Sequence, residues 1–304
     1  MHSLVLGSVF LSADFWDSTI RITGPIALAA MACAICSRAG VLFIGVEGVM
    51  LIAAFFSIAG TAWSGSIWVG VLIAAVAGMF SALLFGFLSM TLRMGDVVAG
   101  LIVHVGALGL TAFLVAEFFP NGATIGDKAL GPLWGSFGGR ASNVLFHQQP
   151  LVYVTIVVAI VMEAFLRTRW GLRVRSSGES VRVARAFGLG LVRLRFAVLA
   201  VAGVVTGLGG ATIGLAIVGT FDTNIVSGRG FIGLACVMLG AWRPVAVLVA
   251  SALFGAGYAV QFRVSAIGQW IQLFPYVMTL IAIALLWGRA QGPAEEGRGL
   301  DETS

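Results

Sequence analysis

The chain has 304 residues, of which 59% are hydrophobic and only 10% are charged. Soluble globular domains carry about 25% charged residues, so this chain cannot cover a water-facing surface of ordinary polarity. The composition therefore excludes an ordinary soluble enzyme, a disordered regulator and a nucleic-acid-binding protein. It predicts an integral membrane protein, with membrane lipid as its surroundings.

Long apolar runs recur along the whole chain. A helix needs about 20 apolar residues to cross ~30 Å of hydrocarbon, and eight runs meet or approach that length. A ninth run, over residues 231–241, is too short to span and is expected to be a half-helix or a compressed crossing. We therefore predict an all-α, polytopic bundle of about nine spans (eight to ten). The eight longer runs cover residues 20–36, 41–59, 67–91, 97–117, 151–166, 196–218, 245–262 and 270–287.

The arginines predict the orientation of the bundle. Nine crossings from an outside N-terminus place thirteen of the eighteen Lys and Arg residues inside, in agreement with the positive-inside rule. The C-terminus is then inside. We expect one transmembrane domain over 1–304, with the helical bundle over 20–287 and a long inner loop over 167–195. The polar tail over 288–304 is expected to be disordered.

Motifs for catalysis and for metal binding are missing from the sequence. Lys128 is followed by Ala129, which does not fit a phosphate-binding P-loop, and neither HExxH nor GxSxG occurs. Three scattered histidines give no metal cluster. Cys33 and Cys36 have CxxC spacing but lie inside an apolar run, which favours helix packing. We expect no enzyme activity, no metal and no cofactor.

Polar residues at membrane depth are the candidates for a transport path, because a buried charge must face protein or water. Glu47 lies between Gly45 and Gly48, which indicates a helix break or a pore-lining turn; the alternative is an ion pair with an arginine that locks two helices. His104 lies in the middle of a span and either lines the path or donates to a backbone carbonyl. Asn224 follows a span and either lines an outer vestibule or caps the next helix.

The inner loop contains a short amphipathic pattern over residues 179–187. Ser177 or Ser180 is expected to cap the start of this helix, and Gly188 to end it. The helix either lies on the membrane surface or docks into a cytoplasmic partner. Its apolar stripe consists of Val181, Ala184 and Phe187.

Four segments resemble the signatures of type II ABC-importer permeases. The resemblance leans toward the nucleoside and simple-sugar (ribose-like) permeases more than toward the branched-chain amino acid permeases, which stay an alternative. Two positions depart from the family pattern: Phe43 and His104 each stand where an asparagine is common. The most specific segments are RAGVLFIGVEGVMLIAAFF (38–56) and GRGFIGLACVMLGAWRPV (228–245), and the others cover 94–114 and 171–211.

The resemblance implies a permease subunit of an ATP-driven importer in the bacterial inner membrane. It implies three kinds of partner: a cytoplasmic ABC ATPase, a second permease (homodimer or heterodimer), and an extracytoplasmic substrate-binding protein. It places Gly45, Glu47 and Gly48 near the translocation path. The coupling helix to the ATPase would cover residues 177–188, with these members: Gly178, Glu179, Ala184, Phe187 and Gly188.

Two hypotheses from other functional classes compete with that of an ABC permease. A secondary transporter needs intramembrane acidic pairs for ion coupling, and only Glu47 and Glu163 are candidates. A scaffold protein would explain the glycine-rich spans but not the basic amphipathic loop.

Overall fold

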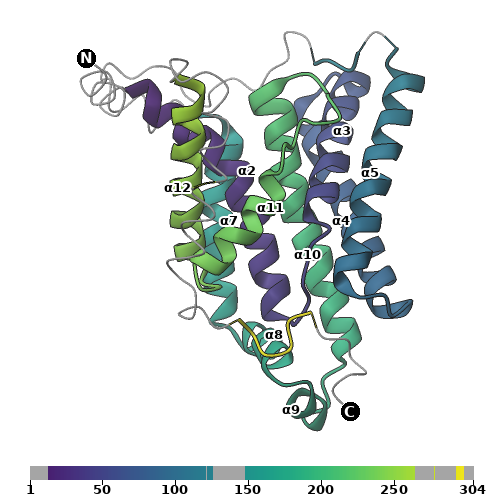
Figure 1. The fold of residues 1–304 in the computed structure, drawn as a ribbon, viewed down its shortest axis with the longest axis vertical. Coiled ribbons are helices and arrows are strands. Elements are labelled where there is room, and N and C mark those ends of the chain that lie inside the picture. Colours follow the sequence, from purple (N-terminus) through teal and green to yellow (C-terminus); the bar gives the residue numbers. More distant parts are fainter. Residues whose placement is uncertain (1–12, 121, 126–147, 264–276, 278–291, 298–304) are drawn as a thin grey trace.

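The computed structural model describes residues 13–120, 122–125, 148–263, 277 and 292–297 (Figure 1). Within these residues the chain is helical, with a single isolated β-bridge between Thr124 and Thr220. The α-helices are α2 (Ala13–Arg38), α3 (Val46–Ser64), α4 (Ile67–Gly86), α5 (Asp96–Phe118), α7 (Pro150–Leu166), α8 (Arg169–Glu179), α9 (Val181–Ala186), α10 (Leu191–Ala211), α11 (Arg229–Leu239) and α12 (Pro244–Arg263). Two π-helical turns, η1 (Phe87–Thr91) and η2 (Thr212–Val218), continue α4 and α10.

The all-α membrane bundle is confirmed, but the count of nine spans is not. Six of the described helices are long and apolar enough to cross a membrane, and a seventh span results if α7 and α8, bent by 78°, are counted as one. The short run is indeed an 11-residue helix, α11. The expected span over 270–287 lies outside the described residues.

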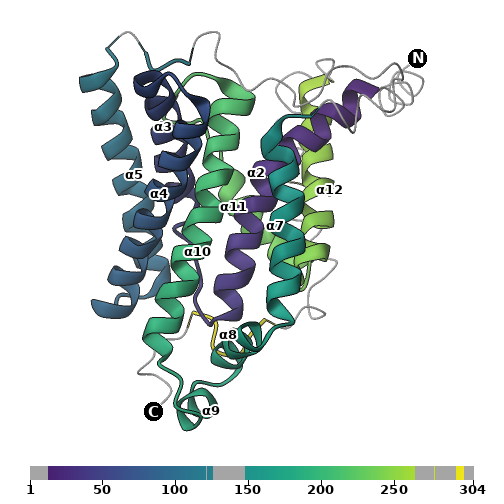
Figure 2. The same cartoon turned by 180° about the vertical axis from the view of Figure 1, so that it is seen from behind.

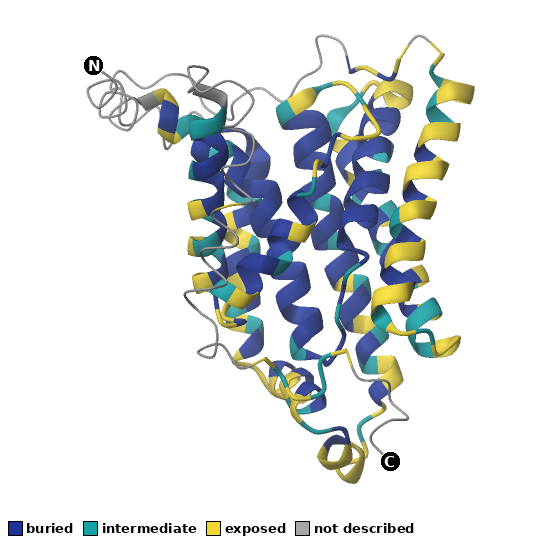
Figure 3. Cartoon of the chain, in the orientation of Figure 1, coloured by how far each residue is buried: buried dark blue, intermediate teal, exposed yellow. Residues whose placement is uncertain are grey.

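Helix α2 forms the centre of the bundle and packs against α12, α10, α11 and α7 (Figure 2). Helix α3 is also mostly buried, between α4, α10 and α5. Helix α5 lies at the edge, where most of its apolar side chains are exposed (Figure 3). An exposed apolar face is stable against lipid or against another membrane protein, so the outer helices carry the surfaces that meet the surroundings.

The helices approach one another through glycines. A Cβ atom on Gly203 of α10 would lie 2.6 Å from the carbonyl oxygen of Gly78 of α4, and one on Gly207 would lie 2.9 Å from Cα of Ala75. A Cβ on Gly210 would lie 2.8 Å from Ala53 of α3. Since lipid gives helices no hydrophobic drive to associate, such backbone contacts supply the packing energy.

The arginine-rich end of the bundle, which carries α8, α9, Arg38 and Arg243, is held by bonds to backbone carbonyls. Arg38 Nε donates to the carbonyl of Trp242 at 3.0 Å, and Arg195 Nε donates to the carbonyl of Ala39 at 3.0 Å. Together these two bonds tie the end of α2 to the α11–α12 turn and to α10.

Six residues of the C-terminal tail, 292–297, also lie at this end. The backbone N–H of Glu295 donates to the carbonyl of Gly178 at 2.9 Å, and Glu296 lies beside Ser37 and Trp242. The disordered tail over 288–304 stays a prediction, and these six residues are the described part of it. Small residues (Gly292, Gly297) and backbone hydrogen bonding let them fit against the bundle despite their polarity.

Candidate transport path and coupling region

Helix α3 starts inside the bundle and not at its end. The sequence pattern predicts a span from residue 41, but residues 41–43 form no helix and α3 begins at Val46. The backbone N–H of Leu42 donates to Oδ2 of Asp96 at 2.8 Å, and the other oxygen of Asp96 accepts from the hydroxyl of Ser89. Because residues 41–43 are not helical, the N–H of Leu42 has no carbonyl partner within a helix, and the carboxylate of Asp96 accepts its hydrogen bond instead.

Two glycines let neighbouring helices press against the start of α3: Gly48 faces α5, and Gly45 faces α4. A Cβ atom on Gly48 would lie 2.7 Å from Cα of His104, and one on Gly45 would lie 3.2 Å from the ring of Phe85. Both glycines are buried. The two glycines therefore allow close approach between helices. As a result, His104 of α5 lies beside the first turn of α3.

Helix α11 also starts inside the bundle. Its N-cap residue, Gly228, has a positive φ of 78°. The carboxylate of Glu47 accepts hydrogen bonds from the backbone N–H groups of Gly228 (2.8 Å), Gly230 (2.7 Å) and Phe231 (3.3 Å). The first N–H groups of a helix have no partner within it, and its N-terminus favours negative charge. Glu47 itself lies in the first turn of α3. Its carboxylate therefore accepts hydrogen bonds from the start of α11 and places negative charge near the N-termini of both helices.

The alternative ion pair between Glu47 and an arginine is not what the structure shows. Arg229, which stands between the Glu47 donors Gly228 and Gly230, donates to the carbonyl of Ile225 at 2.9 Å and lies over the ring of Tyr258. Glu47 is only 4% exposed, and its carboxylate is occupied by backbone donors. It therefore holds the broken helices together and does not itself face an opening.

His104 lies beside this junction and is partly exposed. Its ring contacts Phe231 edge to face, with 5.7 Å between ring centroids, and its Nδ1 has no hydrogen-bond partner. In the described part of the chain the ring donates to no backbone carbonyl. His104 is eight residues from the start of α5, so the junction lies about 12 Å from the arginine-rich end. That depth is near the middle of the ~30 Å hydrocarbon layer.

The structure thus brings together four of the five predicted path residues: Gly45, Glu47, Gly48 and His104. Asn224 is exposed in the connection between η2 and α11, where its carbonyl accepts from the Ser227 hydroxyl at 2.6 Å. The predictions missed three residues that bind Glu47: Gly228, Gly230 and Phe231. The repeated glycines of GRGF (228–231) were a signal for a helix start. Nothing in the sequence, however, indicates that the N–H groups of this segment bind Glu47.

The inner loop forms two helices where the sequence pattern predicts one. Ser180 is extended (φ −157°) and separates α8 from α9; its hydroxyl accepts from the N–H of Val183 at 3.4 Å, so it is the cap of α9. Gly188 ends the segment with a positive φ of 71°. Phe187 does not share the buried stripe, because α9 ends at Ala186.

The five predicted coupling residues have different environments. Gly178 packs against the carbonyl group of Arg38, where a side chain would collide with backbone. Ala184 is buried against Val181 and Leu191. Glu179 and Phe187 are exposed, and among the described residues Phe187 is the most exposed of the large apolar side chains, at 80%. The exposed ring of Phe187 thus stands at the outer end of this region, and Gly178 attaches the region to α2. Gly188, with its positive φ, turns the chain after Phe187.

Within the described chain, no three His, Cys, Asp or Glu side chains come together in a way that could hold a metal ion. Cys33 and Cys36 are buried free thiols inside α2.

Comparisons with known proteins place a chain of this architecture among transport permeases. Residues 16–283 match the family described as "Branched-chain amino acid transport system / permease component", and the chain belongs to that family. It is the membrane-spanning permease subunit of an ABC importer, as the resemblance predicted, and a multi-pass protein of the cell membrane.

Two relatives are similar over nearly their whole length. The nucleoside ABC transporter permease protein NupC of Lactococcus lactis is 32% identical over 279 residues, which cover 86% of this chain and 88% of NupC. The guanosine ABC transporter permease protein NupQ of Bacillus subtilis is 29% identical over 308 residues, which cover 92% of this chain and 94% of NupQ. Both carry the names of transport permeases and not of enzymes.

A solved structure supports the fold. A chain described as an inward-facing conformation of a metal-chelate type ABC transporter superimposes with a TM-score of 0.54 and 15% sequence identity. The match covers 90% of this chain and 85% of that one. At this identity the likeness concerns the fold alone.

Proposed function

We propose that this permease imports nucleosides. The observation that carries the substrate class is the similarity to nucleoside and guanosine permeases over 88% and 94% of their lengths. The departures at Phe43 and His104 concern residues close to the proposed path, so ribose-like sugars and branched-chain amino acids are the competing substrates that the experiment below must separate.

The proposed path passes the junction of α3, α5 and α11. His104 and Phe231 are partly exposed there, while Glu47 behind them fixes the backbone of both broken helices. A nucleoside combines a flat base with a polar ribose, and base–aromatic stacking contributes about 1–3 kcal/mol per base. Phe231 would offer a ring face and His104 a hydrogen-bonding nitrogen, and Asn224 would line the entrance on the outer side.

A second permease subunit would close this path on its open side. The face of α5 beside His104 is apolar and exposed; Leu101 and Val105, for example, are 50% and 64% exposed. A polar path at membrane depth must be shielded from lipid. We propose that a homodimer or heterodimer partner covers this face, and that a substrate-binding protein delivers the nucleoside from outside.

The ATPase would dock on α9 at the arginine-rich end, which we place in the cytoplasm by the positive-inside rule. Phe187 supplies an exposed apolar anchor. Behind it, Gly178 packs on Arg38, and the hydroxyl of Ser177 donates to the carbonyl of Ala39 at 3.4 Å. A push on α9 would thus reach the connection 39–45, which leads to Glu47. Rigid-body transmission of this kind is a common form of switching.

Uptake by the reconstituted transporter tests the proposal. The chain is placed in liposomes with its ATPase, its second permease subunit and its binding protein, and uptake of labelled guanosine, ribose and leucine is compared with and without ATP. We expect ATP-dependent uptake of guanosine. Preference for ribose or leucine would overturn the substrate class, and uptake driven by an ion gradient without nucleotide would overturn the ABC mechanism.

A further inference from the structure

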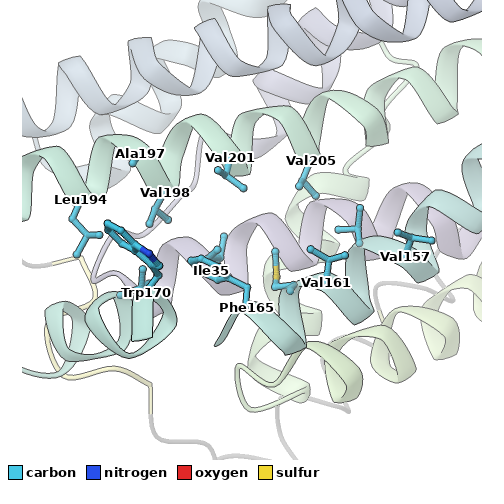
Figure 4. Close-up of a pocket in the computed structure, with 13 residues that line it drawn as sticks. Ile35, Val157, Val161, Phe165, Trp170, Leu194, Ala197, Val198, Val201 and Val205 are labelled. Atoms are coloured by element: carbon cyan, nitrogen blue, oxygen red, sulfur yellow. The ribbon is translucent and has the colours of Figure 1, made fainter. Parts of the chain in front are cut away.

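A second feature with the form of a binding site is the groove between α7 and α10 (Figure 4). Both helices pack on α2, which forms the floor of the groove. The volume is about 430 Å³, within the range of about 300–1,000 Å³ that is common for ligand pockets. All thirteen lining residues are apolar or aromatic.

The groove is partly open. Its deepest residues are buried: Ile35 on α2 is 3% exposed and Val198 on α10 is 5% exposed. The residues on its two rims are exposed, for example Val161 on α7 at 59% and Val201 on α10 at 52%. The helices that form it are apolar enough to cross a membrane, so hydrocarbon from surrounding lipid would gain dispersion contacts by filling it.

The length of the groove matches one leaflet of a bilayer. Along α10 it runs from Leu194 to Val205, and eleven residues of helix rise about 16 Å. Half of a ~30 Å hydrocarbon layer is about 15 Å. Leu194 and Trp170 form the end of the groove at the arginine-rich end of the bundle, so the groove occupies the leaflet on that side.

Positive charge surrounds this end. The guanidinium of Arg173 lies 4.6 Å from the centroid of the Trp170 ring. Arg169 and Arg193 are exposed and adjoin the lining residues Trp170 and Leu194 in sequence, and Arg193 also lines a smaller hollow beside Arg185. Arg167, in contrast, is paired with Glu163 at 2.8 Å. In the part of the chain that the structure describes, Arg169, Arg173 and Arg193 form no ion pair.

We propose that the groove binds an anionic phospholipid, with one acyl chain along α2 and the phosphate held by Arg169, Arg173 and Arg193. The apolar lining fits a hydrocarbon chain, and the arginines, which form no ion pair among the described residues, fit a phosphate, which guanidinium groups bind well. Trp170 lies between the two regions, as tryptophan does at membrane interfaces. Basic pockets between membrane helices bind anionic headgroups elsewhere for the same reason. This inference does not depend on the transported substrate.

Lipid retention by the intact transporter provides the test. The complete complex is taken from nanodiscs that contain equal amounts of phosphatidylglycerol and phosphatidylcholine, and bound lipid is measured by native mass spectrometry. We expect phosphatidylglycerol to be retained in preference. Arg173→Gln and Arg193→Gln should each weaken its retention about fivefold, and Val201→Trp, which fills the groove, should abolish it.

Matched controls separate this site from general binding to a positive surface. Arg175→Gln changes the same charge on another face of α8, and Val249→Trp adds the same ring to an exposed position on α12; both should retain the lipid as the unchanged chain does. Equal retention of the two lipids, or full retention in Val201→Trp, would overturn the proposal. So would disulfide cross-linking of Val201→Cys to a second polypeptide, because a protein helix would then cover the groove.

Discussion

Glu47 and Gly230 are 183 positions apart in the chain, yet the N–H of Gly230 donates to Oε2 of Glu47 at 2.7 Å. The contact joins the first turn of α3 to the first turn of α11, so two interrupted helices meet through one side chain and three backbone donors. Discontinuous membrane helices with helix termini near the bilayer centre are typical of transporter binding sites. The path proposed above passes this contact.

Replacement of Glu47 by glutamine tests this contact. The amide nitrogen of Glu47→Gln would face backbone N–H donors, and the negative charge at two helix N-termini would be lost. Hydrogen bonds to charged groups contribute about 1.5–3 kcal/mol, so we expect a clear loss of thermal stability and of uptake. Thermal-shift assays and transport assays measure the two effects.

The control is Glu163→Gln, which removes a carboxylate from a surface pair with Arg167. Exposed pairs contribute about 0–1 kcal/mol, so this variant should resemble the unchanged chain. If Glu47→Gln were as stable as Glu163→Gln, the joining role of Glu47 would be refuted.

Gly230→Ala tests the same contact by crowding it. The added Cβ would lie 2.7 Å from Oε2 and 2.9 Å from Cα of Glu47, and overpacking of this kind costs about 1–3 kcal/mol. Gly106→Ala on α5 is the matched control, because nothing lies within 4 Å of its Cβ. There alanine should be neutral or stabilising by about 0.5–1 kcal/mol. Unfolding of both variants in the same detergent gives the comparison, and equal stability would contradict the close approach.

Phe187→Ala tests the coupling role. Because Phe187 is 80% exposed, its removal should leave the thermal stability of the isolated permease unchanged. We expect weaker capture of the ATPase subunit and a loss of ATP-driven uptake. Phe80→Ala on α4, at 62% exposure, serves as the control and should retain both activities. Normal ATPase capture by Phe187→Ala would remove Phe187 from the docking surface.

The docked tail should respond to pH. Partial burial beside Ser37 and Trp242 raises the pKa of Glu296, and the docked state therefore prefers the protonated carboxyl. The contribution of Glu296 to docking is complete below the pKa of the free carboxyl and is lost as pH rises through the raised value. Limited proteolysis of the tail should accordingly become faster from acid to neutral pH. Glu296→Gln should cut this dependence, and an unchanged pH profile in that variant would assign the effect to another group.

The sequence predicts those features that depend on local patterns. The apolar runs predict most of the helices, Ser180 and Gly188 mark the start of α9 and the end of its turn, and the glycines around Glu47 indicate the break. The partner of Glu47 was not predictable, because its donors are backbone groups far along the chain and carry no residue signature. Helix α8 was missed because its arginines resemble a loop, and its burial against Arg38 arises only in the folded bundle.

The glycine seam between α4 and α10 has a consequence for motion. Where Gly78 meets Gly203 with backbone against backbone, neither helix can slide or rotate without collision. Helices α4 and α10 therefore behave as one rigid unit, called the plate below. Both helices of this plate change to π-helical winding at their C-terminal ends, in η1 and η2. Short stretches of altered winding often mark functional sites within helices. Bending during each cycle should therefore concentrate at these two wider turns, on opposite ends of the plate, while the plate itself swings undeformed.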